Sequence, residues 1–290
     1  MEHDTLEAGS VERQRRYAGT PRIPDLIELV KHTWSRLIAA SARSLPDPCI
    51  QGAVEELRRR VREVYSPEEV YGVMNDPEIL RLLPELLSRL SDAEGESERC
   101  EARSLVGRPA LNLLELRELA VWPIYDTLVG RELEKWRSLA GQEHKRRPIA
   151  FVGSGPLPMS PVLLHLKEGL PVTCVDIDPA ACEVSGELIG RLGLGAGVQV
   201  VNHPGAAFDY APYGTVFVAS LVTGKSSVLE QIRRTQPQAL VAVRTAEGMR
   251  RLMYESVDEE AWEAAGWRLL DRTPPVERIV INSTLFYRRA

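Results

Sequence analysis

The decapeptide Ile149-Ala-Phe-Val-Gly-Ser-Gly-Pro-Leu-Pro158 decides the fold of the second half of this chain. Its apolar start, Ile149–Val152, predicts a buried strand, its glycines predict a tight turn, and a helix-like segment follows. In an α/β fold such a turn presents backbone N–H groups to a nucleotide-like ligand. The prolines Pro156 and Pro158 make the turn stiffer than the loop of a generic dinucleotide-binding protein.

Strands and helices alternate on both sides of this turn. We expect strands at Pro148–Val152, Pro171–Ile177, Val198–Asn202, Tyr213–Ala219 and Ala239–Val243. Between them we expect helices at Val162–Lys167, Ala180–Leu192 and Ser226–Arg234, and after them two antiparallel strands at Trp267–Leu270 and Arg278–Phe286. This alternation predicts a Rossmann-like, doubly wound α/β sheet with helices on both faces.

The first half of the chain is mostly helical by pattern. Apolar residues recur at helical spacing across residues 26–38 and 54–64, and Ser66-Pro-Glu-Glu69 predicts a capping box that begins a further helix. We expect a helix over Ile79–Leu90, limited or kinked by Pro84, and another from Leu105 to Trp136, interrupted at Pro123. The sequence therefore predicts an all-helical domain at residues 1–145 and a Rossmann-like domain at residues 146–290.

Composition limits the classes of function. The 290 residues are 44% hydrophobic and 27% charged, with a net charge of −5, so they can bury a core but do not suggest a nucleic-acid-binding protein. The arginine clusters Arg58–Arg60 and Lys145–Arg147 are interpreted as solvent-exposed surface. No apolar stretch is long enough to cross a membrane and the first residues are polar, so we expect a cytoplasmic protein without a signal peptide.

The cysteines and histidines do not suggest a metal site. None of the four cysteines forms a C-x-x-C pair, and Cys174, within an apolar run, is expected to be a buried, reduced thiol. The five histidines lack the spacing of metal ligands. We therefore expect no protein-bound metal.

The predicted strand ends suggest an adenosyl ligand. Asp176 ends the second strand about twenty residues after the glycine turn, where a carboxylate can accept hydrogen bonds from ribose hydroxyls. Asn202 and His203 end the third strand, where such folds hold adenine. The turn has no third glycine for a pyrophosphate, which favours S-adenosylmethionine (SAM) as co-substrate. The alternative is that the glycines serve only the turn from strand to helix.

Methyl transfer is the default chemistry for a SAM-binding sheet, but the expected acceptor motif is missing. After the fourth strand the chain continues as Phe217-Val-Ala-Ser-Leu-Val-Thr-Gly-Lys225, without an acidic or Asn-Pro-Pro-type motif. The residues alone therefore leave the reaction open.

Several short stretches together carry a more specific pattern. They are Asp92-Ala-Glu-Gly95, Trp122-Pro-Ile-Tyr125, Phe151-Val-Gly-Ser-Gly-Pro-Leu-Pro-Met-Ser160, Val175-Asp-Ile-Asp178, Val216-Phe-Val-Ala-Ser-Leu-Val222, Val243-Arg-Thr-Ala-Glu-Gly-Met-Arg250 followed by Tyr254, and Ile281-Asn-Ser283. This pattern resembles that of the nicotianamine synthases and their bacterial relatives, the aminobutanoyltransferases of opine-type metallophore pathways. The resemblance covers residues 93–289.

The resemblance implies an unusual use of SAM. The 3-amino-3-carboxypropyl (2-aminobutanoyl) arm is transferred, rather than the methyl group. The amine of an acceptor amino acid, for which we expect histidine, attacks the carbon next to sulfur, and methylthioadenosine leaves. The helical domain is expected to hold the acceptor, and the product is expected to enter metallophore biosynthesis.

The resemblance also implies site residues. Glu94 is the expected base, Tyr125 is expected to hold the donor arm or the acceptor, and Arg244 is expected to clamp a carboxylate. The residues expected at the donor are Gly153, Ser154, Gly155, Pro156, Leu157, Asp176, Asn202, His203, Ala219 and Arg244. Without the resemblance, Glu94 is one of several solvated helix glutamates, alongside Glu96, Glu98 and Glu101.

Three alternatives stay open at this point. The first is a nicotianamine synthase that uses SAM repeatedly as donor and acceptor, the second is a SAM-dependent methyltransferase, and the third is a SAM-binding regulatory module. The expected partners are a small amino acid, a downstream opine-type dehydrogenase and a second copy of the chain in a homodimer, but no nucleic acid and no membrane. The sequence does not decide the identity or chirality of the acceptor, or the number of transfers.

Overall fold

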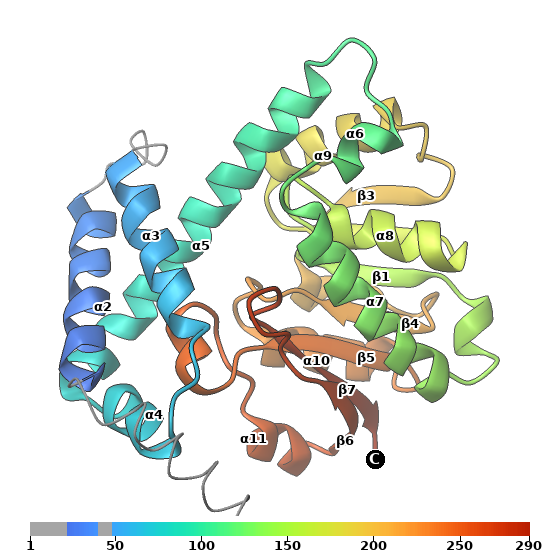
Figure 1. Cartoon of the computed structure of the whole chain (residues 1–290). Coiled ribbons are helices and arrows are strands. Elements are labelled where there is room, and N and C mark those ends of the chain that lie inside the picture. The colour runs from blue at the N-terminus through green and yellow to red at the C-terminus, as the bar shows by residue number, and fades with distance from the viewer. Residues whose placement is uncertain (1–21, 40–47) are drawn as a thin grey trace, which may run out of the picture.

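A seven-stranded sheet forms one side of the molecule, in a computed structural model that describes residues 22–39 and 48–290 (Figure 1). The strand order is β3-β2-β1-β4-β5-β7-β6, and β1 to β5 pair in parallel, whereas β7 pairs antiparallel with both β5 and β6. The strands are β1 (Ile149–Val152), β2 (Val172–Asp176), β3 (Val198–Asn202), β4 (Thr215–Val218), β5 (Leu240–Thr245), β6 (Trp267–Thr273) and β7 (Ser283–Arg289). The prediction of a doubly wound Rossmann-like sheet is confirmed.

The last strand begins later than predicted. The expected strand over Arg278–Phe286 begins at Ser283, because the chain first makes a tight turn in which Val276 and Val280 form an isolated bridge. Arg278, inside this turn, has a φ of 61°, a left-handed conformation that is incompatible with an extended strand. The apolar pattern of the segment therefore extends beyond the strand itself.

Helices cover both faces of the sheet. On one face, Val228 and Ile232 of α10 (Lys225–Thr235) and Trp262 of α11 (Glu259–Ala264) pack on side chains of β1, β4, β5 and β7. On the other, Leu133 and Trp136 of α7 (Trp122–Leu139) pack with α8 (Met159–Glu168) on the alternate residues of the same strands. The helix α9 (Pro179–Arg191) covers β3. Both faces are buried, as a parallel sheet requires.

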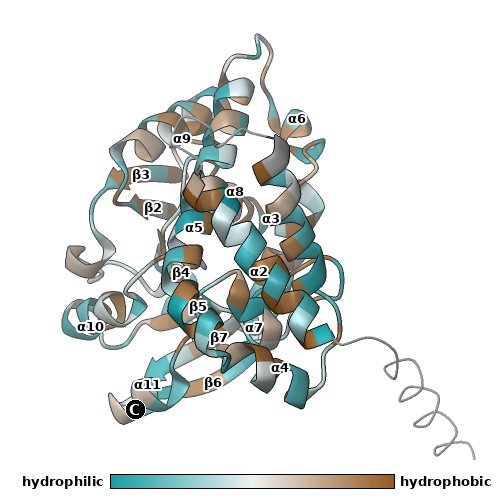
Figure 2. Ribbon diagram, turned by 90° about the vertical axis from the view of Figure 1, so that its left-hand side faces the viewer, coloured by the Kyte–Doolittle hydropathy of each residue, from teal (hydrophilic) through white to brown (hydrophobic). Residues whose placement is uncertain are grey.

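A group of helices lies beside the sheet and contains α2 (Arg22–Ala39), α3 (Pro48–Val61), α4 (Pro67–Met74) and the first half of α5 (Pro77–Val106). The short α6 (Leu113–Arg117) lies apart from this group and packs through Leu116 with α8, α9 and the end of α5. The capping box of α4 is present as predicted, since Ser66 accepts a hydrogen bond from the Glu69 N–H and the Glu69 carboxylate accepts one from the Ser66 N–H. Figure 2 shows hydrophobic and hydrophilic residues along α2, whose buried side carries Leu26, Val30 and Leu37.

Two proline predictions need revision. Pro84 does not end its helix: α5 continues to Val106, because Ile79 and Leu86, on either side of the proline, lie in the same apolar core. Pro123 does not interrupt a helix but lies in the first turn of α7, where its missing N–H has no helical partner to lose. The end of α5, the short α6 and most of α7 therefore occupy the stretch from Leu105 to Trp136, where a helix interrupted at Pro123 was expected.

The helix α5 links the helical group to the sheet. At 30 residues it spans about 45 Å. Its beginning packs in the helical core through Leu86 and Leu90, and its end packs on α9 through Ala102 and Leu105. Its middle turns therefore pass over the edge of the sheet where the parallel strands end (Figure 1).

Among the residues that the structure describes, no helix is long and apolar enough to cross a membrane.

Candidate active site

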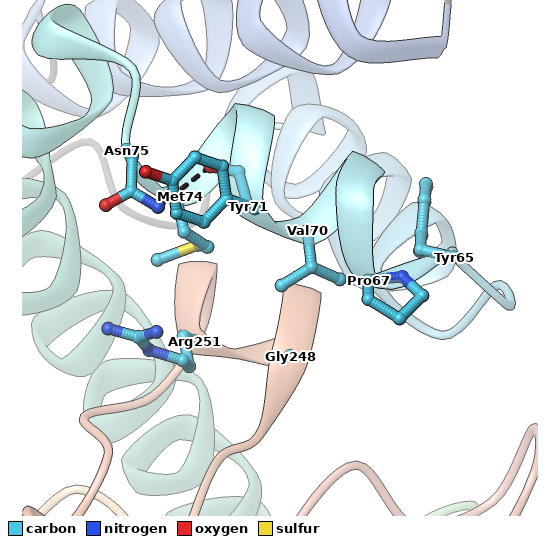
Figure 3. Close-up of a pocket in the computed structure, with 8 residues that line it drawn as sticks. All are labelled: Tyr65, Pro67, Val70, Tyr71, Met74, Asn75, Gly248 and Arg251. Atoms are coloured by element: carbon cyan, nitrogen blue, oxygen red, sulfur yellow. Dashed lines mark hydrogen bonds between the residues drawn. The ribbon is translucent and has the colours of Figure 1, made fainter.

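A cavity of about 1390 Å³ lies between the middle of α5 and the carboxyl ends of β1, β2, β4 and β5. Open α/β sheets bind their ligands at this edge. A second pocket, of about 460 Å³, lies between α4 and the turn that contains Gly248 and Arg251 (Figure 3). No carboxylate lines that second pocket, whereas several line the large cavity, which is therefore the candidate active site.

The glycine turn after β1 forms one wall of this cavity. Gly153 and Gly155 have φ values of 76° and 66°, which side chains disfavour. A Cβ at position 153 would lie 2.4 Å from Val222 Cγ2, and one at position 155 would lie 2.9 Å from Glu98 Oε2. The turn therefore needs both glycines, and it brings bare backbone to the cavity together with Ser154, Pro156 and Leu157.

Asp176 holds the glycine turn in place. Its Oδ2 accepts a hydrogen bond of 2.8 Å from the Gly155 N–H, and its Oδ1 accepts one of 3.0 Å from the Asp178 N–H. A carboxylate has about four acceptor positions, so Asp176, which lines the cavity, retains capacity for ligand hydroxyls. The following residue, Ile177, is 70% exposed and lines the same cavity, which gives a flat ligand an apolar surface.

Asn202 and His203 do not line the cavity. The Asn202 side-chain amide and the His203 backbone N–H both donate to the backbone oxygen of Asp176, at 3.0 and 2.9 Å. The cavity wall beyond β3 is made instead by Pro204, Gly205 and Ala206. These two predicted residues are therefore placed behind Asp176 rather than beside a ligand.

Two further polar atoms at the cavity have no partner in the described residues. Ser154 Oγ and Asn282 Oδ1 are buried without a hydrogen bond, although Asn282 donates through Nδ2 to Ser220 Oγ at 2.5 Å. Buried polar atoms are normally paired, so these two are available to a bound molecule. Ala219 also lines this part of the cavity.

Glu94 projects from α5 into the cavity opposite the glycine turn. Its carboxylate accepts hydrogen bonds of 3.1 and 3.2 Å from the Tyr254 hydroxyl, and Arg58 Nη2 lies 4.0 Å from Glu94 Oε2. Burial raises the pKa of Glu94, and the positive charge of Arg58 and the hydrogen bond from Tyr254 oppose that rise. A carboxylate with a raised pKa binds a proton more readily, which suits a general base near neutral pH.

Glu98 is a site residue that the sequence analysis missed. It lies one turn after Glu94 on α5, and its Oε1 accepts a hydrogen bond of 3.0 Å from the Tyr125 hydroxyl. Burial, together with the negative charge of Glu94, raises the pKa of Glu98 to about 8. Its interpretation as a solvated neighbour was wrong, and the spacing i, i+4 from Glu94 is the signal that places both on one face of a helix.

Tyr125 reaches the cavity from α7. The negative charge of Glu98, followed by burial, raises the pKa of Tyr125 well above its usual value, so its hydroxyl remains a hydrogen-bond donor. The structure therefore brings together Glu94, Glu98, Tyr125 and Tyr254, from three separate segments of the chain, around one side of the cavity.

Arg244 lies at the end of β5 as predicted, but the carboxylate that it clamps belongs to the protein. Its Nε and Nη2 each donate to an oxygen of Glu132 on α7 at 2.9 Å, and Nη2 also donates to Ser160 Oγ. Glu132 is fully buried and accepts a further hydrogen bond from Thr284. Because its guanidinium is occupied by these contacts, Arg244 fixes α7 and α8 to the sheet rather than clamping a ligand carboxylate. Arg244 also lines the cavity.

The arginine cluster on α3 is not uniformly exposed. The Arg59 side chain is 60% exposed, whereas that of Arg58 is 26% exposed and lines the cavity together with Arg62. The interpretation of this cluster as solvent-exposed surface is therefore correct for Arg59 and wrong for Arg58.

The described cysteines and acids form no metal site. Cys100, Cys174 and Cys182 are free, and Cys174 is buried as predicted. In the described part of the chain, no three His, Cys, Asp or Glu side chains are grouped so that they could hold a metal ion. Cys49 belongs to α3, but its side chain lies outside the described ones.

The fold and the cavity define an α/β protein of the Rossmann-like class, with a ligand site that a helical region covers. The family model described as "Nicotianamine synthase protein" matches residues 48–290, and the chain belongs to that family. The family predicted from the sequence is thus confirmed.

Individual relatives agree with this assignment. The chain is 37% identical over 123 residues to the L-histidine 2-aminobutanoyltransferase of Pseudomonas aeruginosa, an alignment that covers 42% of this chain and 46% of that protein. It is 27% identical over 259 residues to the probable nicotianamine synthase 3 of Hordeum vulgare, covering 84% and 74% of the two proteins. The chain thus spans less than half of the length of the first of these relatives.

Solved structures agree on the fold. The crystal structure of a mutant of MtNAS in complex with S-adenosylmethionine superposes with a TM-score of 0.76 at 22% identity, covering 91% of this chain and 98% of that chain. The complex of MtNAS with MTA and tNA superposes with a TM-score of 0.75.

Proposed function

We propose that this protein is a SAM-dependent aminobutanoyltransferase, which moves the 3-amino-3-carboxypropyl group of SAM onto the amine of an amino acid and releases methylthioadenosine. Histidine is the proposed acceptor. The assignment rests on the family and on the name of the bacterial relative, an L-histidine 2-aminobutanoyltransferase. It also rests on the chemistry of the cavity described above.

One observation carries the proposal: a base and a nucleoside-type wall face each other across one cavity. Glu94 has a raised pKa and lies on the helical side, while Gly155 and Asp176 lie on the sheet side. A module that only binds SAM would need no such base. This arrangement therefore supports group transfer over a regulatory function.

The features of the sheet side fit SAM. The bare backbone of the glycine turn allows close approach of the nucleoside, Asp176 has acceptor capacity for the ribose hydroxyls, and Ile177 offers an apolar surface to adenine. The unpaired Ser154 Oγ and Asn282 Oδ1 can accept hydrogen bonds from the amino group of the donor arm. SAM is a substrate in this scheme, consumed in each turnover.

The proposed step is a displacement at carbon. The lone pair of the acceptor amine forms a bond to the donor carbon next to sulfur, while the carbon–sulfur bond breaks and its electron pair stays on sulfur. The sulfonium becomes the neutral thioether of methylthioadenosine. Glu94 takes the proton that the amine loses, and Tyr254 and Arg58 hold the Glu94 carboxylate in position for this transfer.

Two further outcomes are testable alternatives. The first is repeated transfer with SAM as acceptor, which gives a nicotianamine-type product and which the 27% identity to the Hordeum vulgare relative makes a reasonable alternative. The second is methyl transfer.

We also propose a cytoplasmic location, two domains divided near residue 145, and a homodimer. A downstream dehydrogenase of opine type is the proposed partner, because the free amine of the product is a suitable substrate for it.

The experiment is an incubation of the purified protein with SAM, with and without L- or D-histidine, followed by mass identification of products. We expect methylthioadenosine and a histidine adduct that carries one transferred arm. S-adenosylhomocysteine would overturn the proposal and indicate methylation. A heavier product formed from SAM alone would indicate repeated transfer.

A further inference from the structure

Two arginines on the α3 side face the cavity beside the proposed base. Glu55, Arg58 and Arg62 follow at helical spacing, and all three line the cavity. Arg58 lies 4.0 Å from Glu94 and also donates to Glu55 at 2.7 Å. The cavity therefore has a cationic group next to its base, on the side opposite the glycine turn.

Arg62 has no counterion of its own. Its guanidinium forms no hydrogen bond or ion pair with the residues that the structure describes, and its Nε is buried without a partner. Its neighbour of like charge, Arg58, is already shared between Glu55 and Glu94. Burial, and then the charge of Arg58, lower the pKa of Arg62, and the negative charge of Glu55 opposes this lowering only in part.

We infer that Arg62, with Arg58, binds the α-carboxylate of the acceptor amino acid. This inference rests on the proposed function and names the chemical group by which the acceptor is recognised. A guanidinium matches a carboxylate with two parallel hydrogen bonds, and binding of a carboxylate would pair the unpartnered Nε.

The covalent geometry of an α-amino acid supports this position. Its amine and its carboxylate are bonded to the same carbon, so a base that serves the amine must lie next to a cation that serves the carboxylate. Glu94 and Arg58 meet this requirement at 4.0 Å. The carboxylate of the SAM arm is one bond farther from its reacting atom, so it is the less suitable ligand for these arginines.

The test compares two acceptors that differ only in the carboxylate. Release of methylthioadenosine is measured with L-histidine and with L-histidinol, in which a hydroxymethyl group replaces the carboxylate. The wild-type protein should prefer histidine in kcat/KM, and Arg62→Gln should lose about 10- to 100-fold on histidine with little change on histidinol. The KM for SAM should stay the same. Arg62→Lys should restore part of the preference, since it keeps the charge but not the fork.

Arg59→Gln is the matched control. Arg59 belongs to the same helical segment, but its side chain is exposed and pairs with Glu56. It should leave both acceptors unaffected. An equal loss on both acceptors in Arg62→Gln, or a raised KM for SAM, would overturn the inference.

Failure of the proposed function has a different signature. If no amino acid gives methylthioadenosine with the wild-type protein, the proposed reaction is wrong. The arginine assignment is then decided by calorimetric titration of the SAM-saturated protein with L-histidine and with L-histidinol. Tighter binding of histidine that Arg62→Gln abolishes supports the assignment, and equal affinities contradict it.

Discussion

The two walls of the cavity are built in opposite ways. The sheet wall is made of backbone: the turn at Gly153–Gly155 is held by one hydrogen bond, from the Gly155 N–H to Asp176, and its shape depends on the absence of side chains. The helical wall is made of charged and hydroxyl side chains, of which Glu94, Glu98 and Arg58 come from α5 and α3. The difference teaches that one wall can bind a nucleoside shared by many reactions, while the other determines which reaction follows.

The walls also differ in how they are held. The strands β1, β2, β4 and β5 are fixed by a continuous ladder and by helices on both faces. The helical wall depends on α5, which is anchored at its two ends, and on the buried Glu132–Arg244 pair that joins α7 to the sheet. Substitutions can therefore affect one wall and spare the other.

The largest expected effect comes from a substitution in the helical wall alone. Glu94→Gln removes the proposed base but keeps the shape of the side chain and an acceptor for Tyr254. We expect turnover to fall by about 100- to 10,000-fold, with SAM affinity unchanged. Steady-state release of methylthioadenosine, together with calorimetric titration with SAM, measures both. Full activity in Glu94→Gln would show that Glu94 is not the base.

The next largest effect is expected from removing the buried ion pair that joins α7 to the sheet. Glu132→Ala leaves the Arg244 guanidinium buried without a counterion, and Thr284 Oγ1 loses the carboxylate to which it donates. Such a loss costs about 3–5 kcal/mol in the free energy of unfolding. Urea unfolding measures it, and an exposed pair such as Arg233–Glu230 provides the control, for which Glu230→Ala should leave the free energy of unfolding nearly unchanged.

A pH-dependent effect tests the point where the walls touch, at Glu98 and Gly155. The folded protein holds the pKa of Glu98 at about 8, above its ordinary value of 4.5, so the folded state binds a proton that the unfolded state has released. This contribution to stability is fully present below pH 4.5 and is lost as the pH rises through about 8. Because Glu98 is only half-buried, solvent limits it to about 3 kcal/mol or less.

The measurement for Glu98 is the free energy of unfolding of the wild type and of Glu98→Gln from pH 5 to pH 9. The wild type should lose stability relative to the variant as the pH rises. Parallel curves for the two proteins would show that Glu98 does not carry this raised pKa.

The smallest expected effect comes from a substitution in the sheet wall. Gly155→Ala places a Cβ at a φ of 66° and 2.9 Å from Glu98 Oε2, the end of a side chain that can move. The backbone strain costs about 1–2 kcal/mol, which should appear as weaker SAM binding. Gly130→Ala on α7, where an added methyl group would meet nothing within 4 Å, should leave SAM affinity unchanged. Equal affinities in Gly155→Ala and the wild type would show that the turn does not need its glycine for SAM.

Sequence patterns predicted the sheet wall better than the helical wall. The strand before Gly153, the turn and Asp176 lie within a short stretch whose local hydrogen bonds and alternation determine the structure, so the pattern was sufficient. The order of the edge strands, including the late start of β7, depends on tertiary pairing and on the turn at Arg278. Pattern alone could not give these.

The helical wall depends on contacts between residues far apart in the chain. Tyr254 meets Glu94 across 160 residues and Arg244 meets Glu132 across 112, and no local periodicity encodes either contact. The family resemblance brought Glu94, Tyr125 and Arg244 into consideration, but it did not reveal that Glu98 is partnered with Tyr125 or that Arg244 is already paired. Those facts follow only from the way α5 and α7 cross the sheet edge.

The central claim is that the helical wall directs an amine to the arm of SAM rather than to its methyl group. The most direct measurement follows two isotopic labels in one reaction, with ¹³C in the methyl group of SAM and ¹⁵N in the amino group of its aminobutanoyl arm. We expect ¹⁵N to appear on the amino-acid product and ¹³C to remain in methylthioadenosine. Recovery of the ¹³C label on the amino acid, with ¹⁵N in S-adenosylhomocysteine, would contradict this claim.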